Sequence, residues 1–203
     1  MRQRALARPA RAKTAGVVGR RRARLLGFAL ALCVAAPVSA DTVAGRQALA
    51  DLRALAEQGD AQAQYRLAFV YDRGMGTPPH PNQALKWYRA AAEQGHGRAQ
   101  HELGRIYRKG EHAPRDAAEA RKWFRLAAEQ GIAGAQYALA VMLRDGEGVP
   151  ADVVQAYAWF EVAGALGHPF AWKSRDALGA RLGADQLEQA HGVARRWLAQ
   201  REQ

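Results

Sequence analysis

The sequence has almost no cysteine and little else that carries chemistry. Cys33 is the one cysteine among 203 residues, so no disulfide framework holds the chain together. After residue 40 the only serine is Ser174, and no base stands at helical spacing from it. Because a nucleophile needs a neighbouring base, the sequence predicts no catalytic residues and no enzyme activity.

Metal and cofactor motifs are also missing. Among the six histidines, only His96 and His101 lie near each other on one expected helix, and a step of five residues puts them on different faces. Neither a zinc-type ligand pattern nor a glycine-rich phosphate loop occurs. We therefore expect no metal and no cofactor. The histidines are His80, His96, His101, His112, His168 and His191.

The first forty residues have the composition of an export signal. Residues 1–24 hold nine Arg or Lys and no acid, residues 25–36 are almost wholly apolar, and Val38-Ser39-Ala40 offers small residues for cleavage. A membrane-spanning helix needs about 20 apolar residues, and this apolar run is shorter. These features predict a signal peptide over residues 1–40 and an exported, periplasmic mature chain with no membrane span.

Two details of export stay open. The cluster Arg20-Arg21-Arg22 leaves a twin-arginine signal as an alternative to the general secretory route. A translation start near Val17 or Val18 would give a signal of ordinary length.

The basic balance of the chain belongs to this leader. The formal net charge is +11 from 30 basic and 19 acidic residues; removing the leader's nine basic residues leaves 21 against 19, a charge of +2. A strongly basic domain is the usual sign of nucleic-acid binding. Without it, nucleic acid is not an expected partner.

The strongest pattern present is an internal repeat at an offset of 36 residues, which is typical of stacked arrays. Within each copy, apolar residues recur at three- and four-residue steps over two segments, and this predicts a pair of helices. Glycines end the first helix, and Asp116 with Glu119 and Asp152 with Gln155 form capping boxes that start the second. The matched positions include Trp87, Trp123 and Trp159; Gly74, Gly110 and Gly146; and Gly95, Gly131 and Gly167.

These patterns predict an all-α fold, an α-α superhelix or solenoid of antiparallel helix pairs. The expected parts are a capping helix at 41–58, repeats at 59–94, 95–130 and 131–166, and a degenerate repeat with a C-terminal capping helix at 167–203. Asp185 with Glu188 is the capping box expected to start that last helix.

The segment AQYRLAFVYDRGMGTPPHPNQALKWYRAAAEQG and its two successors resemble the Sel-1-like repeat, a relative of the tetratricopeptide repeat. The resemblance implies a right-handed superhelix whose concave face binds proteins or peptides, without catalysis. His101 and Leu143 replace aromatic residues of the other copies. Certain cysteine-rich members of the family have been linked to β-lactam binding, which leaves a weak hydrolase or a binder of cell-wall fragments as the alternative function.

The positions that vary between copies indicate where a partner would bind. Arg98, Arg105 and Arg108 share one face of the first helix of the second repeat, with His101 between them. Superposing the repeats adds Phe69, Val141 and Arg144 to the same surface. Since arginines make bidentate contacts with carboxylates, this hypothesis predicts a partner protein or peptide with acidic and apolar groups.

Overall fold

A computed structural model describes residues 43–200, and this part of the chain is built of helices without strands. The expected export signal and its cleavage site lie outside the described residues. The helices are α1 (Val43–Glu57), α2 (Ala61–Arg73), α3 (Pro81–Glu93), α4 (Gly97–Lys109), α5 (Ala117–Glu129), α6 (Ala133–Asp145), α7 (Val153–Ala165), α8 (Ala171–Gly179) and α9 (Ala184–Ala199).

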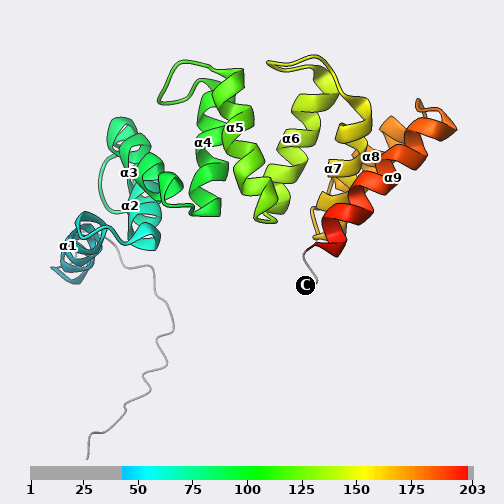
Figure 1. Cartoon of the computed structure of the whole chain (residues 1–203). Coiled ribbons are helices and arrows are strands. Elements are labelled where there is room, and N and C mark those ends of the chain that lie inside the picture. The colour runs from blue at the N-terminus through cyan, green and yellow to red at the C-terminus, as the bar shows by residue number, and fades with distance from the viewer. Residues whose placement is uncertain (1–42, 201–203) are drawn as a thin grey trace, which may run out of the picture. The chain divides into compact units, whose positions relative to one another are not determined.

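From α1 to α8, consecutive helices pack against each other (Figure 1). The hairpins α2–α3, α4–α5 and α6–α7 are the three expected pairs, and each second helix also packs against the first helix of the next pair. The capping helix α1 packs against α2, as a second helix of a preceding pair would. The predicted all-α solenoid of helix pairs is therefore confirmed.

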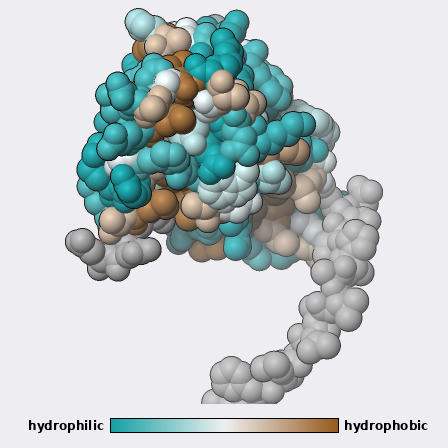
Figure 2. All heavy atoms as spheres, turned by 90° about the vertical axis from the view of Figure 1, so that its right-hand side faces the viewer, coloured by the Kyte–Doolittle hydropathy of each residue, from teal (hydrophilic) through white to brown (hydrophobic). Residues whose placement is uncertain are grey.

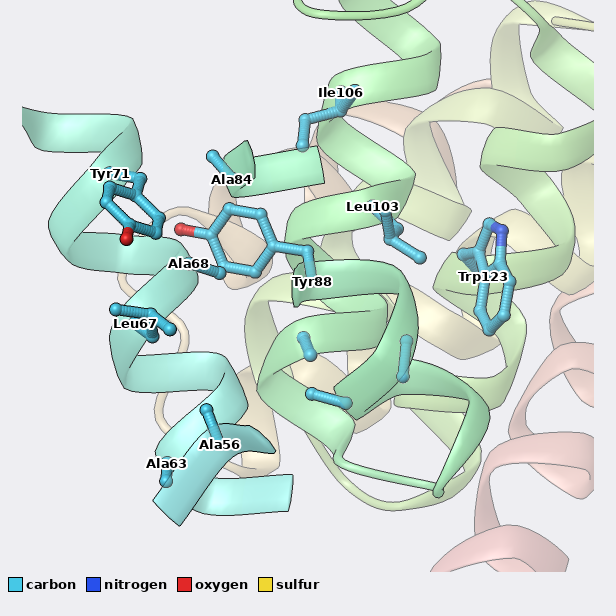
Figure 3. Close-up of a cluster of buried hydrophobic side chains, with 13 residues drawn as sticks. Ala56, Ala63, Leu67, Ala68, Tyr71, Ala84, Tyr88, Leu103, Ile106 and Trp123 are labelled. Atoms are coloured by element: carbon cyan, nitrogen blue, oxygen red, sulfur yellow. The ribbon is translucent and has the colours of Figure 1, made fainter. Parts of the chain in front are cut away.

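One aromatic ring fills the centre of each pair. Tyr88, Phe124 and Phe160 stand at the 36-residue offset and are almost fully buried. Figure 3 shows the first of them, with the Tyr88 ring lying between side chains of α2 and of α4. A Cβ atom on Gly104 would lie 2.6 Å from the Phe124 ring. Small residues on the facing helix are thus required for the ring to fit.

Buried glutamines connect each repeat to the one before it. The side-chain amides of Gln64, Gln100 and Gln136 donate to the carbonyl oxygens of Ala56, Ala92 and Ala128 over 3.1, 3.1 and 3.0 Å. The first two glutamines also accept hydrogen bonds from Gln94 and Gln130. In the third copy Leu166 stands at that position, and Oε1 of Gln136 is buried without a hydrogen-bond partner in the described part of the chain.

This difference makes Leu166→Gln a stabilising substitution. The new amide is expected to donate to Gln136 as its counterparts do, and it satisfies a buried acceptor, so the free energy of unfolding should rise by about 1 kcal/mol. Urea denaturation followed by circular dichroism measures it. Leu126→Gln is the matched control, because Leu126 is similarly exposed, 38% against 40% for Leu166. An equal gain from both variants would show that the hydrogen bond to Gln136 is not the cause.

The helix ends follow the predicted turn chemistry with two differences. Gly74, Gly110 and Gly146 adopt φ angles of 65°, 78° and 71° and end α2, α4 and α6. Asp116 and Asp152 cap α5 and α7. However, neither predicted capping box closes, because the Asp116 and Asp152 N–H groups donate to the carbonyl oxygens of Tyr107 and Leu143. The Glu119 carboxylate accepts from the Trp123 indole instead. The predicted start of the last helix at Asp185 is wrong, because Gly183 is the N-cap and its N–H donates to the Gln186 side chain.

The last two helices cover the end of the third pair. Both α8 and α9 pack mainly against α7. Trp197 stands two residues after the position that the 36-residue offset from Trp159 would give. Its ring meets Trp159 edge-on at 5.5 Å and so covers the third repeat's tryptophan. Figure 2 views the end that carries these helices and shows apolar patches separated by hydrophilic atoms. Between residues 43 and 200, no helix combines the length and hydropathy needed to cross a membrane.

Candidate partner-binding surface

We call the solvent-accessible side chains of α2, α4 and α6 the first-helix surface. All seven residues expected at the binding site lie on these helices. Arg98 is exposed, and the other six are half-buried: Phe69, His101, Arg105, Arg108, Val141 and Arg144.

Arg105 is surrounded by carboxylates. Its Nε donates to Glu102 Oε2 over 2.9 Å, Nη1 bonds to Glu111, and Nη2 lies 3.6 Å from Asp72 Oδ2 in the preceding repeat. Burial disfavours the charged form of Glu102, but hydrogen bonds and charge from His101 and Arg105 outweigh it and lower its pKa to about 2. This arginine therefore joins two repeats.

Arg108 joins the second repeat to the third. Its Nε and Nη2 donate to the two carboxylate oxygens of Glu147 over 2.9 and 2.7 Å, a bidentate pair. The hydrogen bonds from Arg108 lower the pKa of Glu147. In the third repeat, the Arg144 guanidinium pairs with the neighbouring Asp145 over 2.6 and 2.8 Å.

These ion pairs neutralise most of the positive charge expected on the first-helix surface. Arg105, Arg108 and Arg144 are each compensated by carboxylates, whereas no ion pair within residues 43–200 involves Arg98. Phe69 lies beneath the Arg73 guanidinium at 5.5 Å. Of the seven expected residues, Arg98 is thus the one whose charge a binding protein can contact without breaking an ion pair within residues 43–200.

The sequence did not predict that carboxylates pair with these arginines. Glu102 stands three residues before Arg105, a spacing that favours contact on a helix, so this pair could have been predicted from the sequence. Asp72 and Glu147 reach across repeats, so only the packed array brings them to their partners. The same holds for His112, whose Nε2 lies 2.7 Å from Asp72 Oδ1.

His112 also has an unusual backbone conformation. Its φ of 62° is the one positive value on a residue other than glycine in the described chain, and the equivalent Gly76 and Gly148 have φ of 80° and 76°. Left-handed angles cost free energy when a Cβ is present. The contact with Asp72 is one interaction that holds the loop in this conformation.

A second recurring contact stacks a histidine on a tyrosine at the repeat junctions. The His96 ring stacks on Tyr65 with centroids 4.6 Å apart, and His168 stacks on Tyr137 at 4.2 Å. At the middle junction His101 and Ile132 stand in place of the tyrosine and the histidine. His96 also caps α4, because its Nδ1 accepts the Ala99 N–H at 3.2 Å.

This cap predicts a pH effect on stability. Burial lowers the pKa of His96 below its usual range near 6.5, so the folded chain favours the neutral ring. A protonated imidazole has no acceptor nitrogen and cannot cap the helix. The cap's contribution of about 1 kcal/mol is therefore present above pH about 6.5 and is lost as the pH falls through the lowered pKa.

His96→Asp tests this effect, because Asp60 is the cap at the equivalent position of the first repeat. Its carboxylate stays ionised to about pH 4. We expect a smaller loss of unfolding free energy between pH 7 and pH 5 in the variant, measured by urea denaturation. Burial also lowers the pKa of His168, which adds the same pH dependence of stability to the variant and to the wild-type protein. Identical pH profiles would contradict the role of His96.

Within residues 43–200, no three His, Cys, Asp or Glu side chains gather in a way that could hold a metal ion. Ser174 lies 3.2 Å from the Tyr137 hydroxyl, oxygen to oxygen.

Helix pairs at a fixed 36-residue offset, joined by shared cores and buried glutamines, define an α-solenoid of the tetratricopeptide-like class. The family described as Sel1 repeat matches residues 61–96, 97–132 and 133–168, which is more than half of the chain. The chain belongs to the Sel1 repeat family. The matched windows begin two residues after the starts expected from the sequence pattern.

Solved structures of the same fold support this assignment. A protective antigen present in uropathogenic Escherichia coli strains, which displays an SLR fold, is 36% identical with a TM-score of 0.70 over 76% of this chain. The match covers 33% of that antigen's length. A Sel1 repeat protein from Oxalobacter formigenes is 37% identical with a TM-score of 0.61, covering 64% of this chain and 98% of that one.

Helicobacter pylori cysteine rich protein B shares the fold at 21% identity and a TM-score of 0.52, over 66% of this chain and 97% of that protein. A search of curated proteins gave no match.

Proposed function

We propose that this protein is an exported scaffold that binds another protein or peptide in the bacterial cell envelope and carries out no catalysis of its own. The observation that carries the proposal is the difference between the positions that recur in every repeat and those that vary. The positions that recur form the core, the turns and the buried glutamine contacts between repeats, whereas the first-helix surface carries side chains that differ from copy to copy. A variable surface on a fixed frame suits the recognition of one partner.

Export is supported by the leader-like composition of residues 1–40 and by the similarity to a protective antigen of Escherichia coli. The measurement is the mass of the protein recovered from the envelope. Cleavage after Ala40 gives a chain that begins at Asp41 and is found outside the cytoplasm. Full-length protein confined to the cytoplasm would contradict this part of the proposal.

Partner binding is tested by a photo-cross-linking residue placed at Arg98. This position is exposed on the first-helix surface, and changing it breaks none of the ion pairs that join repeats. Charge reversal at Arg105 or Arg108 would disturb those pairs and confuse binding with folding. We expect one reproducible adduct in the native envelope from position 98, to be identified by mass spectrometry.

Arg125 provides the matched control, because it is an exposed arginine on a second helix, α5. No adduct with the same protein is expected from that position. Equal adducts from both positions, or none from position 98, would argue against binding at the first-helix surface.

A further inference from the structure

A hollow of about 540 Å³ lies at the N-terminal end of the described unit. Its walls are one face of α1, the end of α2, the following loop and one face of α3. The volume is in the range of sites that take a small ligand or a few residues of a peptide. None of the expected site residues lines it.

The walls of this hollow carry an excess of positive charge. Arg46, Arg53 and Lys86 line it together with a single acid, Glu57, which gives a net charge of +2. Arg53 is held in place because its Nη2 donates to the Tyr71 hydroxyl over 2.5 Å. That bond uses one of the five N–H donors of a guanidinium. The remaining donors suit a carboxylate.

Between these cations the wall is apolar. Leu49 and Ala50 lie between Arg46 and Arg53 on α1, and the half-buried Trp87 ring lines the hollow from α3. Lys86 lies over the same ring at 5.2 Å. The hollow thus combines separated cationic groups with an apolar middle.

Comparison with the next repeat explains why the hollow exists. The equivalent surface of α3 has Lys86 where α1 has Ala50, and its hollow measures about 360 Å³ and is lined by α3 alone. Trp123, the counterpart of Trp87, is only 8% exposed. A small residue at position 50 therefore leaves open a space that the second copy partly fills.

We propose that this hollow binds an acidic peptide segment of the partner protein. Arg46 and Arg53 are seven residues apart on one helix, so their Cα atoms are about 10.5 Å apart along its axis. In a polyproline II segment, side chains three residues apart point the same way at a spacing of about 9 Å. Two glutamates at that spacing match the two arginines of α1. An apolar residue between them is turned by about 120° about the segment axis and faces Trp87 on α3. The inference rests on the proposed role as a protein-binding scaffold and names the chemistry of the partner.

The test uses the full chain and a labelled, end-capped peptide with the sequence Pro-Glu-Leu-Pro-Glu-Pro. We expect saturable binding by fluorescence polarisation, and no binding when both glutamates are replaced by glutamine. Arg46→Gln should weaken binding about tenfold, the effect of losing a charge-assisted hydrogen bond. Lys86→Gln should also weaken it, because one of the three cations that line the hollow is lost. Arg125→Gln, on another helix, should leave it unchanged.

Ala50→Lys separates the hollow from general charge attraction. The substitution copies the residue of the next repeat, fills the space and adds a positive charge. Loss of peptide binding is expected, whereas attraction by charge alone would make binding stronger. Unchanged or tighter binding in this variant, or equal weakening by Arg125→Gln, overturns the proposal.

The outcome is independent of the cross-link at position 98. An envelope adduct from position 98 without peptide binding removes the hollow as the site and leaves the scaffold function intact. Circular dichroism of each variant checks that the fold is retained, and Arg46→Gln keeps the Arg53–Tyr71 bond.

Discussion

Replacing Phe124 by alanine is expected to lower the free energy of unfolding by about 3–5 kcal/mol. The ring is 2% exposed and fills the centre of the second helix pair. In a repeat array, stability is approximately the sum of terms within repeats and between neighbours. Because this ring belongs to the middle repeat, its loss weakens that repeat and its contacts on both sides. Urea denaturation followed by circular dichroism measures the change.

Two further variants make this prediction specific. Phe170→Ala removes a ring that is 64% exposed and should change stability by less than about 0.5 kcal/mol. Gly104→Ala should destabilise the wild-type chain, since the new Cβ would meet the Phe124 ring at 2.6 Å. In the Phe124→Ala background the same change should stabilise by about 1 kcal/mol, because alanine favours a helix over glycine and the ring is gone. The same sign in both backgrounds would contradict this packing.

Gly148→Ala is expected to lower the free energy of unfolding by about 2–5 kcal/mol. Gly148 has a φ of 76°, where a Cβ costs about 1–2 kcal/mol. The added atom would also lie 2.7 Å from the Cβ of Ala117 and 3.1 Å from its carbonyl carbon. Such overpacking typically adds about 1–3 kcal/mol, and here part of the obstacle is the backbone of α5. The measurement is again the free energy of unfolding in urea.

Gly167→Ala is the control for the backbone angle alone. Gly167 has a φ of 86°, and a Cβ built on it has nothing within 4 Å. Its cost should stay near about 1–2 kcal/mol. Equal losses at both positions would show that the contact with Ala117 relaxes without cost.

Much of the fold follows from the sequence because its causes are local. Apolar residues at three- and four-residue steps require helices with one buried face, and glycines such as Gly110 end them because only glycine takes left-handed angles without cost. The 36-residue offset then requires that equivalent faces pack alike. The start of the last helix was missed because Gly183 caps through its backbone and the Gln186 side chain, and this left no recognisable cap residue.

The sequence predicted which residues form the candidate binding surface, but not which residues they contact. Helical spacing places Arg98, Arg105 and Arg108 on α4, but it does not give the partners of long, flexible side chains. Arg108 pairs with Glu147, which is 39 residues away in the sequence and is brought close by the stacking of repeats.

The sequence by itself determined a repeat array of helix pairs and the residues that build its core and turns. Only the tertiary structure decided which charges remain available to a partner and where a hollow opens. Arg105 meets Asp72 and Arg108 meets Glu147 across repeat junctions, and a single small residue at position 50 leaves space between α1 and α3. Both depend on distances between helices, which the period of a sequence does not contain.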